Sequence, residues 1–244
     1  MRTGKMPATA KLVATKLVSS LRRRGLGGTL KSCAAEIEDI WFDRRFGIDT
    51  LGTARDWSLP TGPFGVGYQP TKITRLKKIF RELRINFGDY IFLDLGSGKG
   101  RALLVASEFP FKRIIGVEVL SEFHLIAERN IRAYRSTTQK CSAIESHCCD
   151  ATLYQLPPDN IVLFLSNPFE HPIVSRVLTN LRESLLTHPR KVYVVYHNPV
   201  CHDLIIRSDF LEVVRTTDLY AIYKSKMPAS RVRIPGFAGV TFMR

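Results

Sequence analysis

The chain has 244 residues, of which 45% are hydrophobic and 24% are charged. These proportions are ordinary for a globular protein, so they exclude a wholly disordered chain, a collagen-like repeat and a disulfide-rich miniprotein. The formal net charge is +14, and the excess lies at the ends: residues 1–31 carry eight Lys or Arg and no acid, and residues 219–244 carry five and no acid. Such ends predict an anionic partner (nucleic acid, a membrane surface or an acidic protein), unless they are merely solvated tails.

The chain has five cysteines, an odd number, and no Cys-x-x-Cys pair. This spacing favours neither a disulfide framework nor a zinc ribbon, so we expect no metal site. Free cysteines suit a reducing compartment, of which the cytoplasm is the simplest. The N-terminus is acid-poor and amphipathic, a composition that mitochondrial presequences share, so that location stays open. No run of about 18 apolar residues is present, and we expect no transmembrane segment.

The first elements predicted are two helices and a long loop. Apolar residues at helical spacing predict a basic helix over residues 9–24, which Gly25 ends. Residues 47–70 hold the densest run of Gly and Pro and are predicted to form an irregular loop that is either functional or disordered. Between them, a second helix is predicted over about residues 30–42, with an apolar stripe of Leu30, Cys33, Ile37, Ile40 and Trp41.

Thr71 can cap a helix that reaches Leu83, whose buried face would hold Ile73, Leu76 and Phe80. From residue 90 onward, strands and helices alternate. Strands are predicted over residues 90–95, 113–119, 144–149, 160–166, 191–196, 210–216 and 219–224, and helices over 99–108, 121–134, 171–186 and 200–206. The last two strands are joined too tightly for a crossover helix, so they should pair antiparallel.

This order predicts an α/β fold with a doubly wound, mostly parallel seven-stranded sheet, an antiparallel last strand and an N-terminal helical extension. The predicted divisions are a basic helical extension (1–46), a Gly/Pro-rich loop over the ligand site (47–71), the strand–helix domain (72–225) and a basic C-terminal tail (226–244).

The sharpest motif is an apolar strand that ends in Asp94 and is followed by Gly96, Gly98 and Gly100 before a helix. Glycines let a ligand lie against bare backbone, and the helix N-terminus offers unpaired N–H groups. Arg101 stands where a dinucleotide fingerprint needs its third Gly or Ala, and the spacing does not match a P-loop. A carboxylate ahead of the glycines would repel a pyrophosphate but would suit an ammonium or a sulfonium.

This stretch resembles motif I of the class I S-adenosylmethionine (SAM)-dependent methyltransferases, and the resemblance spans roughly residues 68–225. It implies SAM as the cofactor, bound by Asp94 and the three glycines in the domain 72–225. Glu118 ends the second strand, where the family places an acid on the ribose hydroxyls; taken alone it could be a helix-start acid, but in this context the ribose role is favoured. Asp150 stands where the family often has an acid near the adenine amine, and a turn aspartate is the competing interpretation.

A second motif, from Ser166 to Phe169, follows the fourth strand. It is similar to motif IV of amine-directed methyltransferases, although it has one proline where the usual motif has two. The resemblance implies that Asn167, Pro168 and Phe169 form the acceptor side, with the Asn167 amide oxygen accepting protons of an amine and Phe169 packing near the cationic centre. The alternative is an Asx-Pro turn that ends a buried strand.

Two further elements are candidates for the cleft. The segment from Tyr68 to Thr71 is similar to a Tyr-x-Pro-Ser/Thr element of some lysine methyltransferases, a mitochondrial family and more distantly the non-SET histone lysine enzymes, where it closes over the cofactor. A plain loop that ends in a helix cap explains it equally well. His197 ends the fifth strand and is a candidate for orienting or deprotonating a substrate, although a lone histidine there is often structural.

We therefore predict a SAM-dependent methyltransferase that is N-directed, with a protein lysine as one possible acceptor. A small amine and a nucleic acid also stay open, because fold does not fix substrate. Two alternatives are a non-catalytic nucleic-acid-binding protein on a methyltransferase-like fold, which the basic ends motivate, and an aminopropyltransferase-like enzyme, which would need additional acids around its polyamine.

Overall fold

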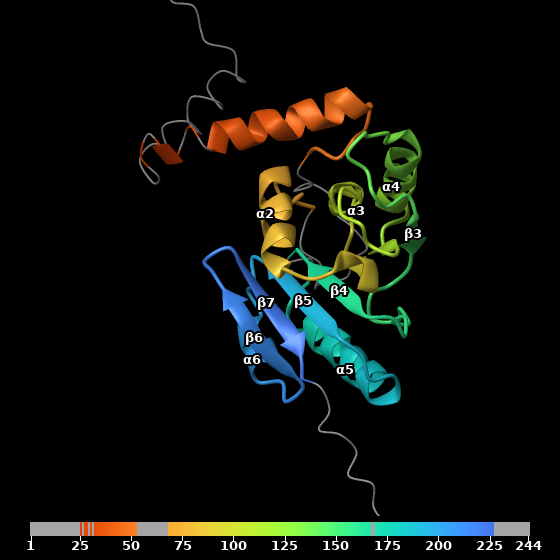
Figure 1. Cartoon of the computed structure of the whole chain (residues 1–244), viewed down its shortest axis with the longest axis vertical. Coiled ribbons are helices and arrows are strands. Elements are labelled where there is room, and N and C mark those ends of the chain that lie inside the picture. The colour runs from red at the N-terminus through yellow and green to blue at the C-terminus, as the bar shows by residue number, and fades with distance from the viewer. Residues whose placement is uncertain are drawn as a thin grey trace, which may run out of the picture.

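The computed structural model describes residues 25, 27, 28, 30, 32–52, 68–166 and 169–226. Its centre is a seven-stranded sheet in the order β3-β2-β1-β4-β5-β7-β6 (Figure 1). β7 pairs antiparallel with both β5 and β6, and the other pairs are parallel. The predicted fold class is therefore confirmed. The strands are β1 (Ile91–Leu95), β2 (Ile114–Glu118), β3 (Ile144–Cys148), β4 (Ile161–Leu165), β5 (Val192–His197), β6 (Leu211–Thr216) and β7 (Tyr220–Ser225).

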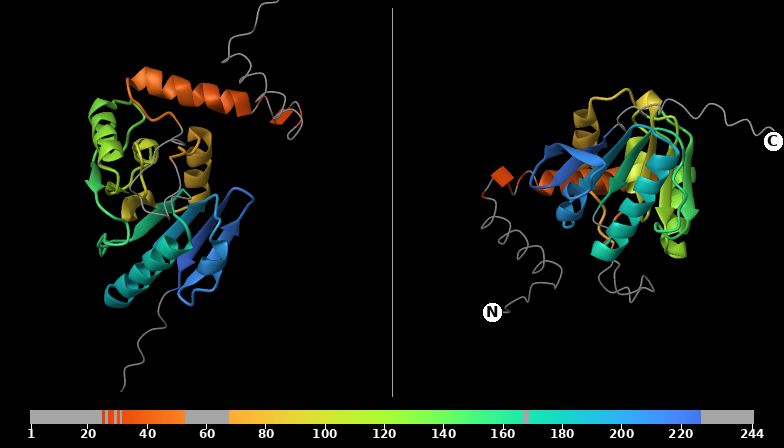
Figure 2. Two further views of the ribbon diagram at one scale, coloured as in Figure 1. Left: turned by 180° about the vertical axis from the view of Figure 1, so that it is seen from behind. Right: turned by 90° about the horizontal axis from the view of Figure 1, so that it is seen from below.

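Helices cover both faces of the sheet. The described helices with complete bounds are α2 (Ile73–Leu83), α3 (Arg101–Ala106), α4 (Ser121–Ala133), α5 (His171–Thr187) and α6 (His202–Ile206), and the short 3-10 helix η2 spans Phe87–Asp89. α5 and α6 pack on one face of the sheet, and α2 and α3 pack on the other (Figure 2). Each helix from α3 onward lies within the range predicted for it or departs by one residue, because the apolar periodicity that marks these helices is local.

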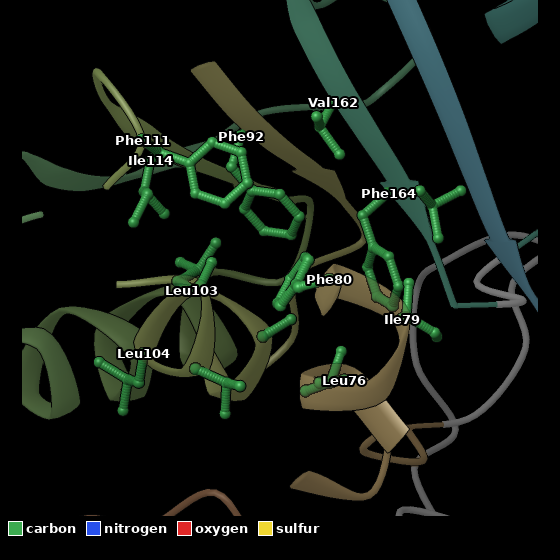
Figure 3. Packing of buried hydrophobic residues seen from close by; sticks show 14 of the residues in the cluster. Leu76, Ile79, Phe80, Phe92, Leu103, Leu104, Phe111, Ile114, Val162 and Phe164 are labelled. Carbon is green, nitrogen blue, oxygen red and sulfur yellow. The ribbon is translucent and has the colours of Figure 1, made fainter. Parts of the chain in front are cut away.

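The side chains of the central strands alternate between two hydrophobic clusters, as the pleat of a strand requires. Phe92 points to the α2 and α3 side and packs with Phe80, Phe111 and Phe164 (Figure 3). Ile91, Leu93 and Leu95 point to the α5 side. Asp94 shares the face of Phe92, so it emerges at the carboxyl end of β1 on the side of α2 and α3.

Residues 32–46 form one helix, here called the N-terminal helix, which runs across the α2 and α4 side of the molecule (Figures 1 and 2). The predicted apolar stripe is not its buried face. Leu30, Ile37, Ile40 and Trp41 are all exposed, whereas Asp39, Phe42 and Asp43 on the opposite side are buried. Phe42 joins the core cluster beneath this helix, and Phe46 packs against that cluster.

The predicted cap of α2 also differs in the structure. α2 begins at Ile73, its N-cap position is Lys72, and neither Lys72 nor Thr71 caps it with a side chain. Instead, the backbone N–H of Ile73 donates to the carboxylate of Asp39 at 3.2 Å, so the cap comes from the N-terminal helix. The buried face predicted for α2 is confirmed, since Ile73, Leu76, Phe80 and Leu83 are buried.

Three expectations lie outside the described residues: the helix over 9–24, most of the loop over 47–70, and the tail beyond residue 226. Within the described ranges, no helix has the length and apolarity needed to cross a membrane. The division of the chain at residues 46, 71 and 225 stays a prediction.

Candidate functional site

The glycine loop between β1 and α3 is shaped by three left-handed residues. Gly96, Gly98 and Gly100 have φ of 81°, 54° and 85°, which residues with a Cβ rarely adopt. At Gly98, a Cβ would lie 2.4 Å from the ring of Tyr68. Tyr68 therefore lies directly against bare backbone, and only glycine fits at this position.

Two carboxylates lie next to this loop. Glu118, at the end of β2, accepts hydrogen bonds from the backbone N–H of Gly98 at 2.8 Å and of Leu120 at 3.0 Å. Burial outweighs these hydrogen bonds and raises the pKa of Glu118. Burial, and then the charge of Glu118, raise the pKa of Asp94 well above its usual range.

Glu118 and Asp94 differ in their hydrogen-bond partners. Asp94 is 3% exposed, and its Oδ1 has no hydrogen-bond partner among the described residues. A buried carboxylate oxygen without a partner is unfavourable unless a donor or a cation reaches it. The space beside Asp94 is therefore suited to a ligand that carries positive charge.

Tyr68 connects the glycine loop to the segment that follows the N-terminal helix. Its hydroxyl donates to the backbone oxygen of Thr50 at 2.8 Å, and its ring lies 5.0 Å from that of Phe123 in α4. Lys99 in the loop forms an ion pair with Asp49 at 2.8 Å. Residues 49–50 and Tyr68 therefore border the loop from outside the strand–helix core.

A buried polar network holds this arrangement in place, and the sequence reasoning missed it. Arg101, at the start of α3, forms ion pairs with Asp39 at 3.2 Å and Asp43 at 3.9 Å, and its Nε donates to the Thr50 hydroxyl at 2.7 Å. Asp43 in turn accepts from the backbone N–H of Thr50 and Leu51. The sequence feature that could have indicated this network is Arg101 at the start of a buried helix. A buried arginine requires acidic partners.

A second polar cluster joins the carboxyl ends of β4 and β5 to the residues before α2. The hydroxyls of Thr71 and Ser166 lie 2.6 Å apart, and Nδ1 of His197 lies 3.3 Å from the first and 3.1 Å from the second. Arg75 Nη1 is 2.8 Å from His197 Nε2. The structure thus brings together Thr71, Ser166 and His197, which the sequence had placed in three separate elements.

The hydrogen bonds define the charge state of His197. Arg75 can only donate, so Nε2 is the acceptor and the ring proton lies on Nδ1. Burial, and then the charge of Arg75, lower the pKa of His197 to about 4. His197 is therefore neutral at physiological pH, and neither ring nitrogen is free to take a proton from a substrate.

The remaining candidates are less closely grouped. Asp150 is exposed, and its Oδ1 accepts from the backbone N–H of Thr152 at 2.7 Å. This hydrogen bond is typical of a turn aspartate, which was the alternative to a contact with adenine. Phe169 packs against the hydrophobic cluster on the α5 side of the sheet. Asn167 and Pro168 lie outside the described residues.

Comparison with known protein families matches one part of the chain. A family model described as histone methylation protein DOT1 matches residues 66–145, a range that holds Tyr68, Thr71, the glycine loop and Glu118. The chain matched no curated protein.

Several solved structures are similar in fold. An RNA methyltransferase from Salinibacter ruber, in complex with S-adenosyl-L-homocysteine, is 20% identical over 66% of this chain and 95% of its own, with a TM-score of 0.44. Magnesium protoporphyrin IX methyltransferase from Synechocystis PCC 6803 is 10% identical over 63% and 78%, with a TM-score of 0.46. A ribosomal protein L11 methylase from Lactobacillus delbrueckii subsp. bulgaricus is 14% identical over 66% and 81%, with a TM-score of 0.46.

Proposed function

We propose that this chain is a class I, SAM-dependent methyltransferase that methylates an amine nitrogen, the acceptor being the side chain of a protein lysine. The match of residues 66–145 to the histone methylation family carries the proposal. That match includes Tyr68 and Thr71 together with the glycine loop, so it spans the segment before the sheet as well as the loop itself.

The residues beside the glycine loop fit SAM. The partnerless Oδ1 of Asp94 would pair with the cationic methionine end of SAM, and the backbone of Gly96, Gly98 and Gly100 would lie against it. Each carboxylate oxygen has two lone pairs, so Glu118 can accept from ribose hydroxyls while it keeps the N–H groups of Gly98 and Leu120.

Two further residues belong to the proposed cofactor side. Tyr68 would cover the loop from outside, as its contact with Gly98 favours. Asp150 would contribute its second oxygen near the adenine, since only Oδ1 is used in the turn. SAM supplies a methyl group on a sulfonium and leaves as a neutral thioether.

The acceptor amine is proposed to enter beside Ser166 and Asn167. A protonated lysine has no lone pair for the methyl group, so the amine must lose a proton before transfer. His197 cannot take that proton, because Arg75 occupies its Nε2 and its Nδ1 is protonated. We infer that solvent takes the proton, and that the Ser166 hydroxyl and the Asn167 amide oxygen accept the remaining N–H bonds of the neutral amine.

Within this proposal, His197 is a positioning residue. It bonds to both the Ser166 and the Thr71 hydroxyls, which lie at the ends of two different segments. Fixing these hydroxyls in advance reduces the entropy lost when the amine is aligned for in-line attack. Phe169 and Pro168 would shape the apolar wall that favours a neutral amine over an ammonium.

The acceptor is tested by incubating the purified chain with methyl-labelled SAM and cell lysate, followed by separation of protein, nucleic acid and small molecules. We expect label in protein, and acid hydrolysis should release it as methylated lysine. Label in nucleic acid or in small molecules alone would refute the lysine acceptor while leaving the methyltransferase assignment intact.

The cofactor side is tested separately by calorimetry with SAM. Asp94→Ala should lose most of the affinity, whereas Asp218→Ala, which removes an exposed acid between β6 and β7, should bind as the unmodified chain does. Equal affinity of the two variants would show that the cofactor is not held at Asp94.

A further inference from the structure

The outer face of the N-terminal helix is apolar and exposed. This outer face consists of Ile37, Ile40 and Trp41, whose side chains are 66%, 41% and 54% exposed. At 100° per residue, all three point within about 50° of one direction. Large apolar residues scattered singly are normal on a surface, but a stripe along one helix marks a contact surface.

The orientation of this helix is fixed by its opposite side. Asp39 and Asp43 are buried against Arg101, and Phe42 is buried in the core. Turning the helix to bury its outer face would separate these charges and expose Phe42. The outer face is therefore directed outward by the same contacts that hold the segment around Thr50.

Two exposed arginines accompany the outer face. Arg44 points within about 10° of its middle and Arg45 about 90° from it, and the guanidinium of Arg45 lies 4.7 Å from the centre of the Trp41 ring. The nearest acids of the helix, Glu36 and Glu38, fall about 100° away to either side. The chain that leads into the helix, residues 1–31, carries eight Lys or Arg and no acid.

We propose that the outer face docks on an anionic lipid surface, with the helix lying in the plane of the interface. An interfacial helix of this kind combines an apolar side containing Trp and aliphatic residues with flanking cations, and its binding grows with apolar area and with anionic lipid. Both requirements are met here by neighbouring residues, and the proposal is independent of the methyl acceptor.

Other occupants fit less well. A second copy of the chain would bring together two segments that each carry eight Lys or Arg and no acid over residues 1–31, and like charges repel. Nucleic acid would match the cations, but Trp41 is the one ring of this face, and the guanidinium of Arg45 already lies over it at 4.7 Å, while Ile37 and Ile40 offer no ring on which a base can stack. Gel filtration and RNA binding distinguish these two occupants from a lipid surface.

The test is co-sedimentation of the full chain with vesicles of phosphatidylcholine, alone or mixed with phosphatidylserine. We expect binding only to the mixed vesicles, weakened by salt. Ile37→Glu should lower the affinity by about tenfold or more, because burial of an aliphatic side chain is lost. Leu186→Glu, which alters a residue of α5 with a similar exposure of 67%, should bind normally.

Fluorescence gives a second readout that does not depend on sedimentation. The chain has two tryptophans, Trp41 and Trp57, so Trp57→Phe leaves Trp41 as the reporter. We expect its emission to shift to the blue with mixed vesicles and to stay unchanged with phosphatidylcholine alone. Because Ile37 is exposed, Ile37→Glu should unfold at the same temperature as the unmodified chain, which separates lost docking from lost folding.

Three results would overturn the proposal. One is the absence of binding to mixed vesicles at low salt together with an unshifted Trp41 emission. Another is normal vesicle binding by Ile37→Glu, which would place the contact elsewhere. The third is a dimer in gel filtration that Ile37→Glu dissociates, or RNA binding that it abolishes, with no vesicle binding in either case.

Discussion

Replacing Arg101 by methionine would leave the carboxylate of Asp43 without a cation among the described residues and that of Asp39 with Lys72 alone, whose Nζ is 3.0 Å away. The side chains of Arg101, Asp39 and Asp43 are each less than a tenth exposed, with the guanidinium 3.2 Å and 3.9 Å from the two acids. Methionine retains most of the packing volume, so the loss is mainly electrostatic. Breaking a buried ion pair on one side typically destabilises a protein by about 3–5 kcal/mol.

The size of the effect can be checked against an exposed pair. Arg113 and Glu145 lie 3.5 Å apart, with side chains 44% and 41% exposed. Arg113→Met should therefore lower the free energy of unfolding by about 0–1 kcal/mol. For a domain of this size, we expect Arg101→Met to lower the melting temperature by roughly 6–20 °C and Arg113→Met by a few degrees at most.

The assay is urea and thermal unfolding followed by circular dichroism. A triple variant (Arg101→Met, Asp39→Asn, Asp43→Asn) should recover part of the stability, because the unpaired charges are removed together. If Arg101→Met and Arg113→Met unfold alike, or if the triple variant is less stable than Arg101→Met, the buried network does not hold the N-terminal helix on the core.

Further predictions concern the cofactor side and His197. Asp94→Asn should raise the melting temperature of the ligand-free chain at neutral pH while weakening SAM binding. Because the pKa of Asp94 is raised in the folded state, this gain in melting temperature should shrink as the pH falls toward 3.8. A gain that does not change with pH would refute the raised pKa of Asp94. Gly98→Ala should weaken SAM binding by displacing Tyr68, whereas Gly88→Ala, where a Cβ meets only ordinary contacts beginning at 3.6 Å, should not. The folded-state pKa of His197 lies below its usual 6.5, so the chain should lose stability as the pH falls from about 6.5 to about 4. His197→Gln should remove that part of the acid sensitivity and, if His197 only positions hydroxyls, should lower kcat without moving the pH profile of methyl transfer.

The positions of the strands along the chain and the glycine loop could be predicted because their signals are local. Apolar runs of about five residues mark buried strands, and Asp94 with three closely spaced glycines leaves few alternatives for the turn that follows. The buried face of α2 was likewise predicted from its 3.6-residue period. Local spacing does not depend on which other segment the element meets, so these features could be predicted from the sequence alone.

The orientation of the N-terminal helix could not be predicted in this way. Its most regular apolar stripe, which includes Ile37 and Trp41, faces outward, and its two aspartates, Asp39 and Asp43, face inward. The reason is Arg101, which lies more than fifty residues further along the chain and requires buried carboxylates. Helical periodicity reports which residues share a face, but only the charge of a distant partner decides which face is buried.

The acceptor side shows the same division. The sequence by itself determined that Thr71, Ser166 and His197 lie at the ends of their segments. Only the tertiary structure decided that they meet in one cluster, that Arg75 holds the histidine neutral, and that Asp39 rather than Thr71 caps α2. A hydrogen bond depends on distances of a few tenths of an ångström between segments, and spacing along the chain contains no such information.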